Sequence, residues 1–352
     1  MTKDFAFTAR RKLLAAGTVG AAGLASPAWI RPARAQTPPL LRYATGGGVG
    51  PNEIETVIFE PWMRKNVLKR HGREYALEMT FTRGTPEAGT LLAAGQVDLC
   101  TMSFPVFAQT VLKNTVPGGV SIMADVFVYT PEGNAADGYF VLADSPIKSV
   151  ADLRGKKIAV NAFGSAVDLA MRVRLKKEGL DPRKDAQVVE IGLANIAAAL
   201  REKRVDCGVL ALPFLAGELQ TGGLRPLFSL ADAFGRYAAI FQVASNRILE
   251  RQPAAVRAYL ADYVEGLQWL YDPANRKQAI ALAAQVTKSP VAVLESYFLT
   301  ERDYFRDRNA CISASVVQAP VDALADEGLI DRRIAVKDYV NTAFLPAACG
   351  GT

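Results

Sequence analysis

From Leu40 onward, short apolar runs alternate with stretches whose apolar residues recur at helical spacing. This alternation predicts an α/β fold with largely parallel sheets. Strands are expected over 40–45, 77–82, 97–102 and 120–129, then, after a strand over 138–143, over 158–160, 188–191 and 205–212. A helix follows most of them, so the chain reads as two successive α/β units.

The remainder of the chain predicts one more strand, over 239–245, and then helices only. The helices are expected over 247–271, 274–287, 290–300 and 313–327. They begin no new βαβ unit, so they are assigned to the first lobe. The predicted architecture is two α/β lobes joined by hinge strands near Tyr139 and Gln242, with a ligand cleft between them. The first lobe comprises 36–138 and 243–352, and the second comprises 139–242.

The N-terminus has the pattern of an export signal. Arg10 and Arg11 precede an apolar run over 13–30, and Ala33-Arg34-Ala35 offers a cleavage site before Gln36. Residues 1–35 are therefore expected to be a signal peptide, and the paired arginines favour the twin-arginine route to the periplasm of a Gram-negative bacterium. The alternative is a membrane anchor, since the run approaches the length that spans a bilayer.

The basic character of the chain is concentrated in this segment. Residues 1–35 hold six basic residues and one acidic residue, so their removal lowers the formal charge from +6 to +1. A nucleic-acid partner is not expected, because it would need a dense basic face.

The four cysteines have no metal-binding or redox spacing. Cys100 and Cys207 lie in apolar, strand-like runs and are expected to be small buried residues. Cys311 and Cys349 could form a disulfide in an oxidising compartment, which would tie the C-terminal tail to the preceding helical region.

Catalysis has little support in the sequence. His71 is the single histidine, so a site with several histidine ligands cannot be assembled. It lies in the polar stretch 69–73, which is interpreted as a solvated helix end, so a Ser-His-Asp triad is not expected. Phosphate-loop, dinucleotide and nucleophile-elbow motifs are absent from the sequence. We expect a protein that is not an enzyme and needs no cofactor or metal.

Candidate binding residues follow the strands. In open α/β sheets a ligand lies beyond the carboxyl ends of the strands, and five loops occupy such positions: 47–52, 83–87, 101–104, 163–166 and 212–214. The candidate ligand contacts, including one residue of a further loop, are Gly47, Gly48, Asn52, Arg83, Gly84, Thr85, Ser103, Phe104, Phe163, Gly164, Ser165, Ala166, Asn195, Pro213 and Phe214.

The loop 163–166 is the sharpest of these candidates. Gly164 permits close backbone approach, and Ser165 with the following helix start could hold an anion. Ser165 could equally cap its own helix, as could Asn195. Arg83 could add a charge for a sulfonate, carboxylate or nitro group, or could be a solvated strand-end residue. The aromatic candidates Phe104, Phe163 and Phe214 could line an apolar pocket or belong to the core.

Several of these segments resemble a known family. They are Asp152-Leu153-Arg154-Gly155-Lys156-Lys157-Ile158-Ala159-Val160, Gly164-Ser165, Gly179-Leu180-Asp181-Pro182, Ala197-Ala198-Ala199-Leu200, Val205-Asp206 and Leu212-Pro213-Phe214. Together they resemble the nitrate/sulfonate/taurine solute-binding proteins of ABC transporters, a family that also includes NMT1-like and THI5-like proteins.

The resemblance implies a type II periplasmic-binding-protein fold with a discontinuous first lobe. It also implies a monomeric receptor that closes on a small, anionic organic molecule and delivers it to an ABC permease. The glycine-rich segment Gly46-Gly47-Gly48 departs from the family's usual form and is similar to receptors of TRAP-type transporters. Such a receptor, a periplasmic sensor module and a biosynthetic enzyme of the same fold remain the alternatives.

Overall fold

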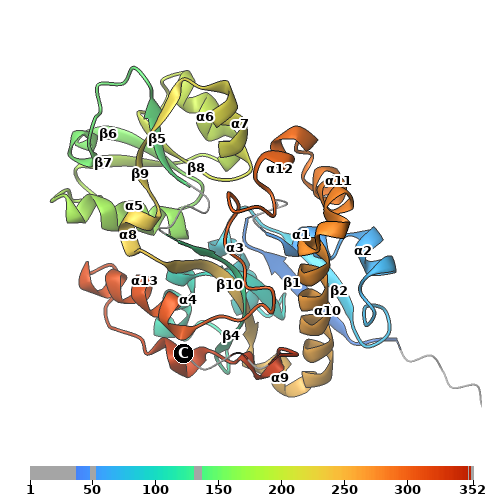
Figure 1. Ribbon diagram of the computed structural model, residues 1–352. Coiled ribbons are helices and arrows are strands. Elements are labelled where there is room, and N and C mark those ends of the chain that lie inside the picture. Colours follow the sequence, from blue (N-terminus) through green and yellow to red (C-terminus); the bar gives the residue numbers. More distant parts are fainter. Residues whose placement is uncertain (1–36, 48–52, 131–136, 348, 350–352) are drawn as a thin grey trace, which may run out of the picture. The chain divides into compact units, whose positions relative to one another are not determined.

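The computed structural model describes residues 37–47, 53–130, 137–347 and 349 (Figure 1). The predicted signal peptide lies outside these residues. Within them, no helix combines the length and apolar character needed to cross a membrane.

The first sheet contains five strands in the order β2-β1-β3-β10-β4. Their bounds are β1 Leu40–Thr45, β2 Ala76–Phe81, β3 Leu99–Ser103, β4 Val120–Tyr129 and β10 Tyr237–Ser245. Strand β1 pairs in parallel with β2 and β3, whereas β10 runs antiparallel to β3 and β4. Every residue of β3 is buried, as expected for a strand covered on both faces.

The second sheet also contains five strands, in the order β7-β6-β8-β5-β9. They are β5 Gly138–Leu142, β6 Lys156–Val160, β7 Ala186–Glu190, β8 Cys207–Leu210 and β9 Leu224–Ser229. Strands β6, β7 and β8 are parallel, and β5 is antiparallel to both of its neighbours. Strand β9 was not predicted from the sequence, because its residues are mostly half-buried and include Pro226.

The chain passes between the sheets twice, between Tyr129 and Gly138 and again between Ser229 and Tyr237. The second passage falls earlier in the chain than the expected hinge near Gln242. Gln242 lies inside β10, buried and paired with Thr101 on one side and Ala124 on the other. The exact ranges predicted for the two lobes stay a prediction.

Helices cover both sheets. Their bounds are α1 Glu55–Ile58, α2 Pro61–Asn66, α3 Thr85–Ala93, α4 Phe104–Lys113, α5 Ala166–Lys177, α6 Leu193–Arg201, α7 Phe214–Thr221, α8 Ala231–Phe234, α9 Asn246–Arg251, α10 Pro253–Tyr271, α11 Arg276–Thr287, α12 Val291–Tyr297 and α13 Ala314–Asp326. The sequence predicted one helix over 247–271, but Pro253 divides it into α9 and α10 because proline cannot continue the backbone hydrogen bonds of a preceding helix.

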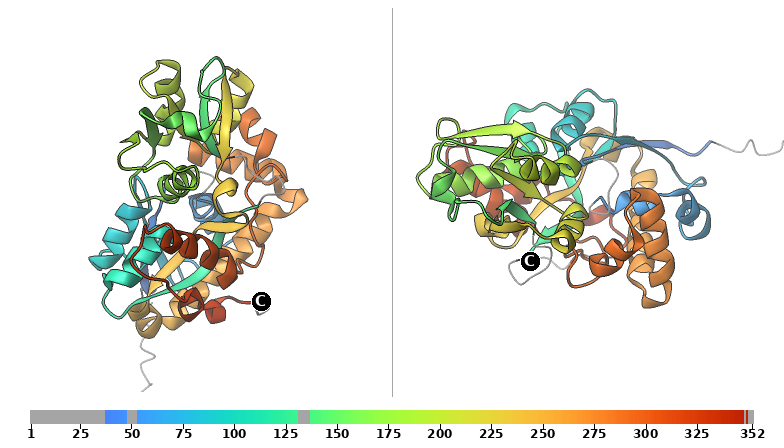
Figure 2. Two further views of the ribbon diagram at one scale, coloured as in Figure 1. Left: turned by 90° about the vertical axis from the view of Figure 1, so that its left-hand side faces the viewer. Right: turned by 90° about the horizontal axis from the view of Figure 1, so that it is seen from above.

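The C-terminal helices are drawn in orange and red in Figures 1 and 2. Helix α10 contacts α1, and α13 contacts β10 and α4. Cys311 and Cys349 form a disulfide with a Cα–Cα distance of 5.5 Å, whereas Cys100 and Cys207 are free and buried.

Candidate functional site

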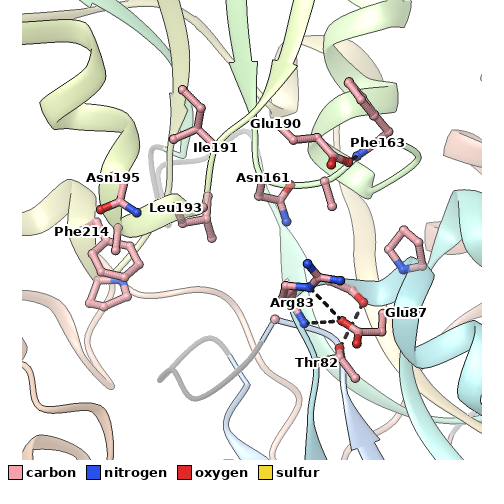
Figure 3. A pocket seen from close by; sticks show the side chains of 17 residues that line it. Thr82, Arg83, Glu87, Asn161, Phe163, Glu190, Ile191, Leu193, Asn195 and Phe214 are labelled. Carbon is pink, nitrogen blue, oxygen red and sulfur yellow. Dashed lines mark hydrogen bonds and ion pairs between the residues drawn. The ribbon is translucent and has the colours of Figure 1, made fainter. Parts of the chain in front are cut away.

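The loops at the carboxyl ends of the parallel strands surround a cavity of about 680 Å³, here called the outer cavity (Figure 3). The first sheet contributes Gly47 after β1 and Thr82 to Gly84 after β2. The second sheet contributes residues 161–163, 190–195 and 213–214, which follow β6, β7 and β8. The volume lies in the range of roughly 300–1,000 Å³ that is typical of small-molecule sites.

A smaller cavity of about 70 Å³, the inner cavity, adjoins the outer one and shares Gly47, Asn161 and Leu193 with it. Its other lining residues are Gly46, Glu53, Thr85, Ser103, Phe127, Tyr129, Asp137, Ser165, Ala166, Val167, Ala211, Ala239, Ile240 and Tyr304. The two cavities together form the cleft. Residues of both sheets therefore line its outer and inner parts.

Most of the predicted contacts lie in this cleft. Gly47, Arg83, Gly84, Phe163, Asn195, Pro213 and Phe214 line the outer cavity, and Thr85, Ser103, Ser165 and Ala166 line the inner one. Gly48 and Asn52 lie outside the described residues. Whether any of these residues contacts a ligand stays a prediction.

Two predicted contacts lie elsewhere. Phe104 is fully buried and packs edge-on against Phe234 and Tyr237, so its ring belongs to the core. Gly164 lines neither part of the cleft, and faces a separate cavity bounded by α3, α4 and α13.

Phe163 and Phe214 are partly exposed within the outer cavity. Their side chains are 48% and 39% accessible, which is unusual for large aromatic residues. In Figure 3 they extend from different segments of the second sheet. They are available to cover the organic part of a bound molecule.

The loop that precedes α5 does not have the free donors expected of an anion site. Ser165 caps the helix by accepting a hydrogen bond from the Asp168 N–H, and its hydroxyl donates to Asn161 Oδ1 at 2.8 Å. The Gly164 N–H donates to Asp168 Oδ2 at 2.8 Å, and the Phe163 N–H donates to Glu190 Oε1. The Phe163 and Gly164 N–H groups, which precede the helix start, thus already donate to carboxylates of the protein.

Arg83 also has a carboxylate partner. Its Nε lies 3.5 Å from Glu87 Oε2, and its backbone N–H donates to the same oxygen at 2.9 Å (Figure 3). Its side chain is 94% exposed, so water screens its charge.

Two buried carboxyl groups line the inner cavity. Glu53 accepts hydrogen bonds from the Gly46 N–H at 3.0 Å and the Thr101 hydroxyl at 2.7 Å. Burial raises the pKa of Glu53 to about 8, and the neighbouring Glu55 adds to that rise. Glu55 accepts from the Tyr43 hydroxyl and from the Gln242 side-chain amide, each at 3.0 Å.

Asp137 is the second carboxyl group of the inner cavity. Its Oδ2 accepts from the Tyr304 and Tyr129 hydroxyls at 2.6 and 2.7 Å, and its Oδ1 accepts from the Leu212 N–H at 3.0 Å. Burial raises the pKa of Asp137 to about 6, although the two tyrosine hydroxyls act to lower it.

Sequence reasoning missed Asn161, Glu190, Glu53, Asp137 and Tyr304 as lining residues. Asn161 and Glu190 could have been found, because they stand at the carboxyl ends of β6 and β7. Asp137 and Tyr304 carry no such signal, since they lie in connecting segments far apart in the sequence.

Comparison with known proteins fits this arrangement. The family model described as NMT1/THI5 like matches residues 76–276, which is more than half of the chain. The chain belongs to the NMT1/THI5-like family. One relative of this NMT1/THI5-like chain is a protein of Escherichia coli (strain K12) that is provisionally named an aliphatic sulfonates-binding protein. The two are 27% identical over 259 residues, which cover 72% of this chain and 76% of that protein. A provisionally named binding protein of Brucella abortus (strain 2308) is 30% identical over 44% of this chain and 48% of its own length.

Solved structures show the same fold for this NMT1/THI5-like protein. The periplasmic aliphatic sulphonate binding protein SsuA from Escherichia coli has a TM-score of 0.66 at 22% identity, covering 90% of this chain and 95% of that one. The periplasmic nitrate-binding protein NrtA from Synechocystis PCC 6803 has a TM-score of 0.67 at 14% identity, covering 87% of each chain. These neighbours confirm the predicted type II periplasmic-binding-protein fold. The desulfurization enzyme DSZB shares the fold, with a TM-score of 0.57 at 18% identity over 87% of this chain and 97% of its own. The fold alone therefore does not distinguish a receptor from an enzyme.

Proposed function

We propose that this protein is a periplasmic receptor that captures a small organic molecule in the cleft and delivers it to the permease of an ABC importer. The observation that carries the proposal is the cleft itself, whose outer part is lined by loops of both sheets. A molecule bound there touches both sheets at once and therefore stabilises their closed arrangement, which a permease can recognise.

The relatives support a receptor rather than an enzyme. The Escherichia coli relative that matches 72% of this chain is named for sulfonate binding. We assign no catalytic residue. Export to the periplasm, through the predicted signal at residues 1–35, and a monomeric state are parts of the same proposal.

Two observations favour different chemical classes of ligand. The names of the relatives favour a sulfonate or another anion, in agreement with the sequence-based expectation. The acidic side chains that line this cleft favour a cationic ligand.

Equilibrium dialysis against a bacterial small-molecule extract tests the receptor proposal. The protein should retain one class of compound, identified by mass spectrometry and chemically unchanged. Phe214→Ala should retain less of it, whereas Leu219→Ala, an exposed residue of the same helix that does not line the cleft, should retain as much as the unaltered protein. Conversion of the retained compound, or no enrichment of any compound, would contradict the proposal.

A further inference from the structure

The ionisable side chains of the cleft are predominantly acidic. Among the described residues that line it, Arg83 is the one basic side chain, while Glu53, Glu87, Asp137 and Glu190 are acidic. Acidic side chains line both parts of the cleft, with Glu87 and Glu190 in the outer cavity and Glu53 and Asp137 in the inner cavity. In Figure 3, Glu190 and Glu87 come from different walls of the outer cavity, with Asn161 and Arg83 between them.

Several of the donors that could bind an anion already have acceptors. Five backbone N–H groups from four cleft loops donate to carboxylates of the protein: Gly46 to Glu53, Arg83 to Glu87, Phe163 to Glu190, Gly164 to Asp168 and Leu212 to Asp137. In receptors for anions such loop N–H groups are ordinary ligand contacts. At these five groups an incoming anion would have to displace a carboxylate or lie beside it, and like charges held close together repel.

Four hydroxyl groups of the inner cavity also donate within the protein. Tyr129 and Tyr304 donate to Asp137, Thr85 donates to Ser103, and Ser165 donates to Asn161. The carboxyl groups, by contrast, gain acceptor capacity when a bound cation ionises them, because each ionised carboxylate has about four lone-pair positions. Ionised Glu53 uses two of these positions within the protein, one on each oxygen.

We propose that the cleft selects a cationic nitrogen group, such as an ammonium, amidinium or guanidinium, rather than an oxyanion. This inference rests on the proposed receptor function and names its ligand class. The nitrogen group would donate hydrogen bonds to the carboxylates, while the exposed rings of Phe163 and Phe214 cover the rest of the molecule, with a face available to the cation. An oxyanion is disfavoured because it would lie beside acidic side chains in both parts of the cleft.

Pairs of probes that match in shape and differ in charge test the inference. Guanidinium against nitrate, benzamidinium against benzoate, and butylammonium against butanesulfonate are titrated into the purified protein by calorimetry and thermal shift. In each pair that binds, the cation should bind more tightly. Glu190→Gln should weaken cation binding about two- to fivefold, and Glu301→Gln, an exposed residue away from the cleft, should leave it unchanged. Tighter binding of the anion in any pair would overturn the inference.

The direction of proton transfer on ligand binding is a second, independent test of the ligand's charge. Because the inner carboxyl groups have raised pKa values, bound cations should release protons from them, and cation affinity should rise between pH 6 and 8. Anion binding would instead take up protons, and its affinity would fall over the same interval. Proton uptake on binding, measured in buffers of different ionisation enthalpy, would therefore contradict the inference.

If none of the titrated probes binds, the electrostatic potential of the cleft can still be measured without a ligand. A fluorophore on Phe163→Cys reports the potential in the outer cavity, and a fluorophore on Leu219→Cys reports an exposed control position. Thallous ion should quench the cleft fluorophore more effectively, relative to iodide, than it quenches the control. The opposite ratio would overturn the inference.

Failure of this inference and failure of the receptor proposal look different. An anion that binds and is recovered unchanged overturns the ligand class and leaves the receptor intact. A cation that binds and is converted to another compound supports the ligand class and contradicts the receptor.

Discussion

The Tyr304 hydroxyl donates a 2.6 Å hydrogen bond to Oδ2 of Asp137, although the two residues are separated by 167 positions in the sequence. Asp137 lies just before β5 of the second sheet, and it also binds Tyr129 at the end of β4 in the first sheet and the Leu212 N–H after β8 in the second. One carboxylate thus joins groups from both sheets next to a passage of the chain between them.

Asp137→Asn should destabilise the protein. The amide offers one acceptor oxygen where the carboxylate accepts three hydrogen bonds, so at least one buried donor loses its partner, at a cost of about 1–3 kcal/mol. Urea denaturation should show this decrease in the free energy of unfolding. Asp331→Asn, on the exposed surface, serves as the control, and equal stability of the two variants would contradict the role assigned to Asp137.

The stability of the protein should fall as the pH rises from 5 to 8.5. Burial raises the pKa of Glu53 to about 8, that of Asp125 to about 8 and that of Asp137 to about 6. Between the ordinary carboxyl pKa near 4 and these values the folded state binds more protons than the unfolded state, so each rise in pH favours unfolding.

The free energy of unfolding, measured by denaturant titration at several pH values, should therefore be highest toward pH 5. Glu53→Gln should reduce the dependence in the interval around pH 8, where Glu53 titrates. A free energy of unfolding that increases steadily from pH 5 to 8 would contradict the assigned shifts.

Gly84→Leu should impair closure of the cleft. A Cβ at Gly84 would lie 3.1 Å from the Cβ of Ala162, which belongs to the loop after β6 of the other sheet. A larger side chain would keep the two loops apart and should lower ligand affinity about tenfold, equivalent to about 1.4 kcal/mol.

The backbone of Gly84 is extended, with φ −176°, so the substitution introduces no backbone strain and the variant should fold. Gly217→Leu is the matched control, because the space around a Cβ there is open. Unchanged affinity in Gly84→Leu would show that these loops do not approach each other in the bound state.

The unfolded, unreduced protein should expose two thiols, and four after reduction, because Cys311 and Cys349 are joined while Cys100 and Cys207 are free. Thiol labelling with mass spectrometry measures this directly. Cys349→Ser should lower the free energy of unfolding by about 2–4 kcal/mol, since the bond closes a long loop in the unfolded chain. Four thiols without reduction would contradict the bridge.

Much of the fold could be predicted because burial imposes a readable pattern on the chain. The apolar runs that end at Val160 and Leu210 identify strands of the second sheet, and the loops that follow them lead to the cleft. Strand β9 could not be predicted, because its residues are only half-buried and Pro226 interrupts the pattern.

The chemistry of the cleft was harder to predict than its position. Ser165 and Gly164 were correctly placed at a helix start, but whether their donors are free depends on where the side chains of Asp168 and Asn161 lie. Phe104 follows β3 as a cleft residue would, yet its ring enters the core. Side-chain direction at such positions is set by tertiary packing, which the sequence pattern does not contain.

Hydrogen–deuterium exchange with and without the compound retained in dialysis tests the central claim most directly, because it reports which backbone groups a bound molecule protects. Ligand in the cleft should slow exchange in residues 82–87 of the first sheet's loops and in residues 190–195 of the second sheet's loops, with the same concentration dependence. Protection confined to the loops of one sheet, or found only outside the cleft, would contradict a receptor that closes around its ligand.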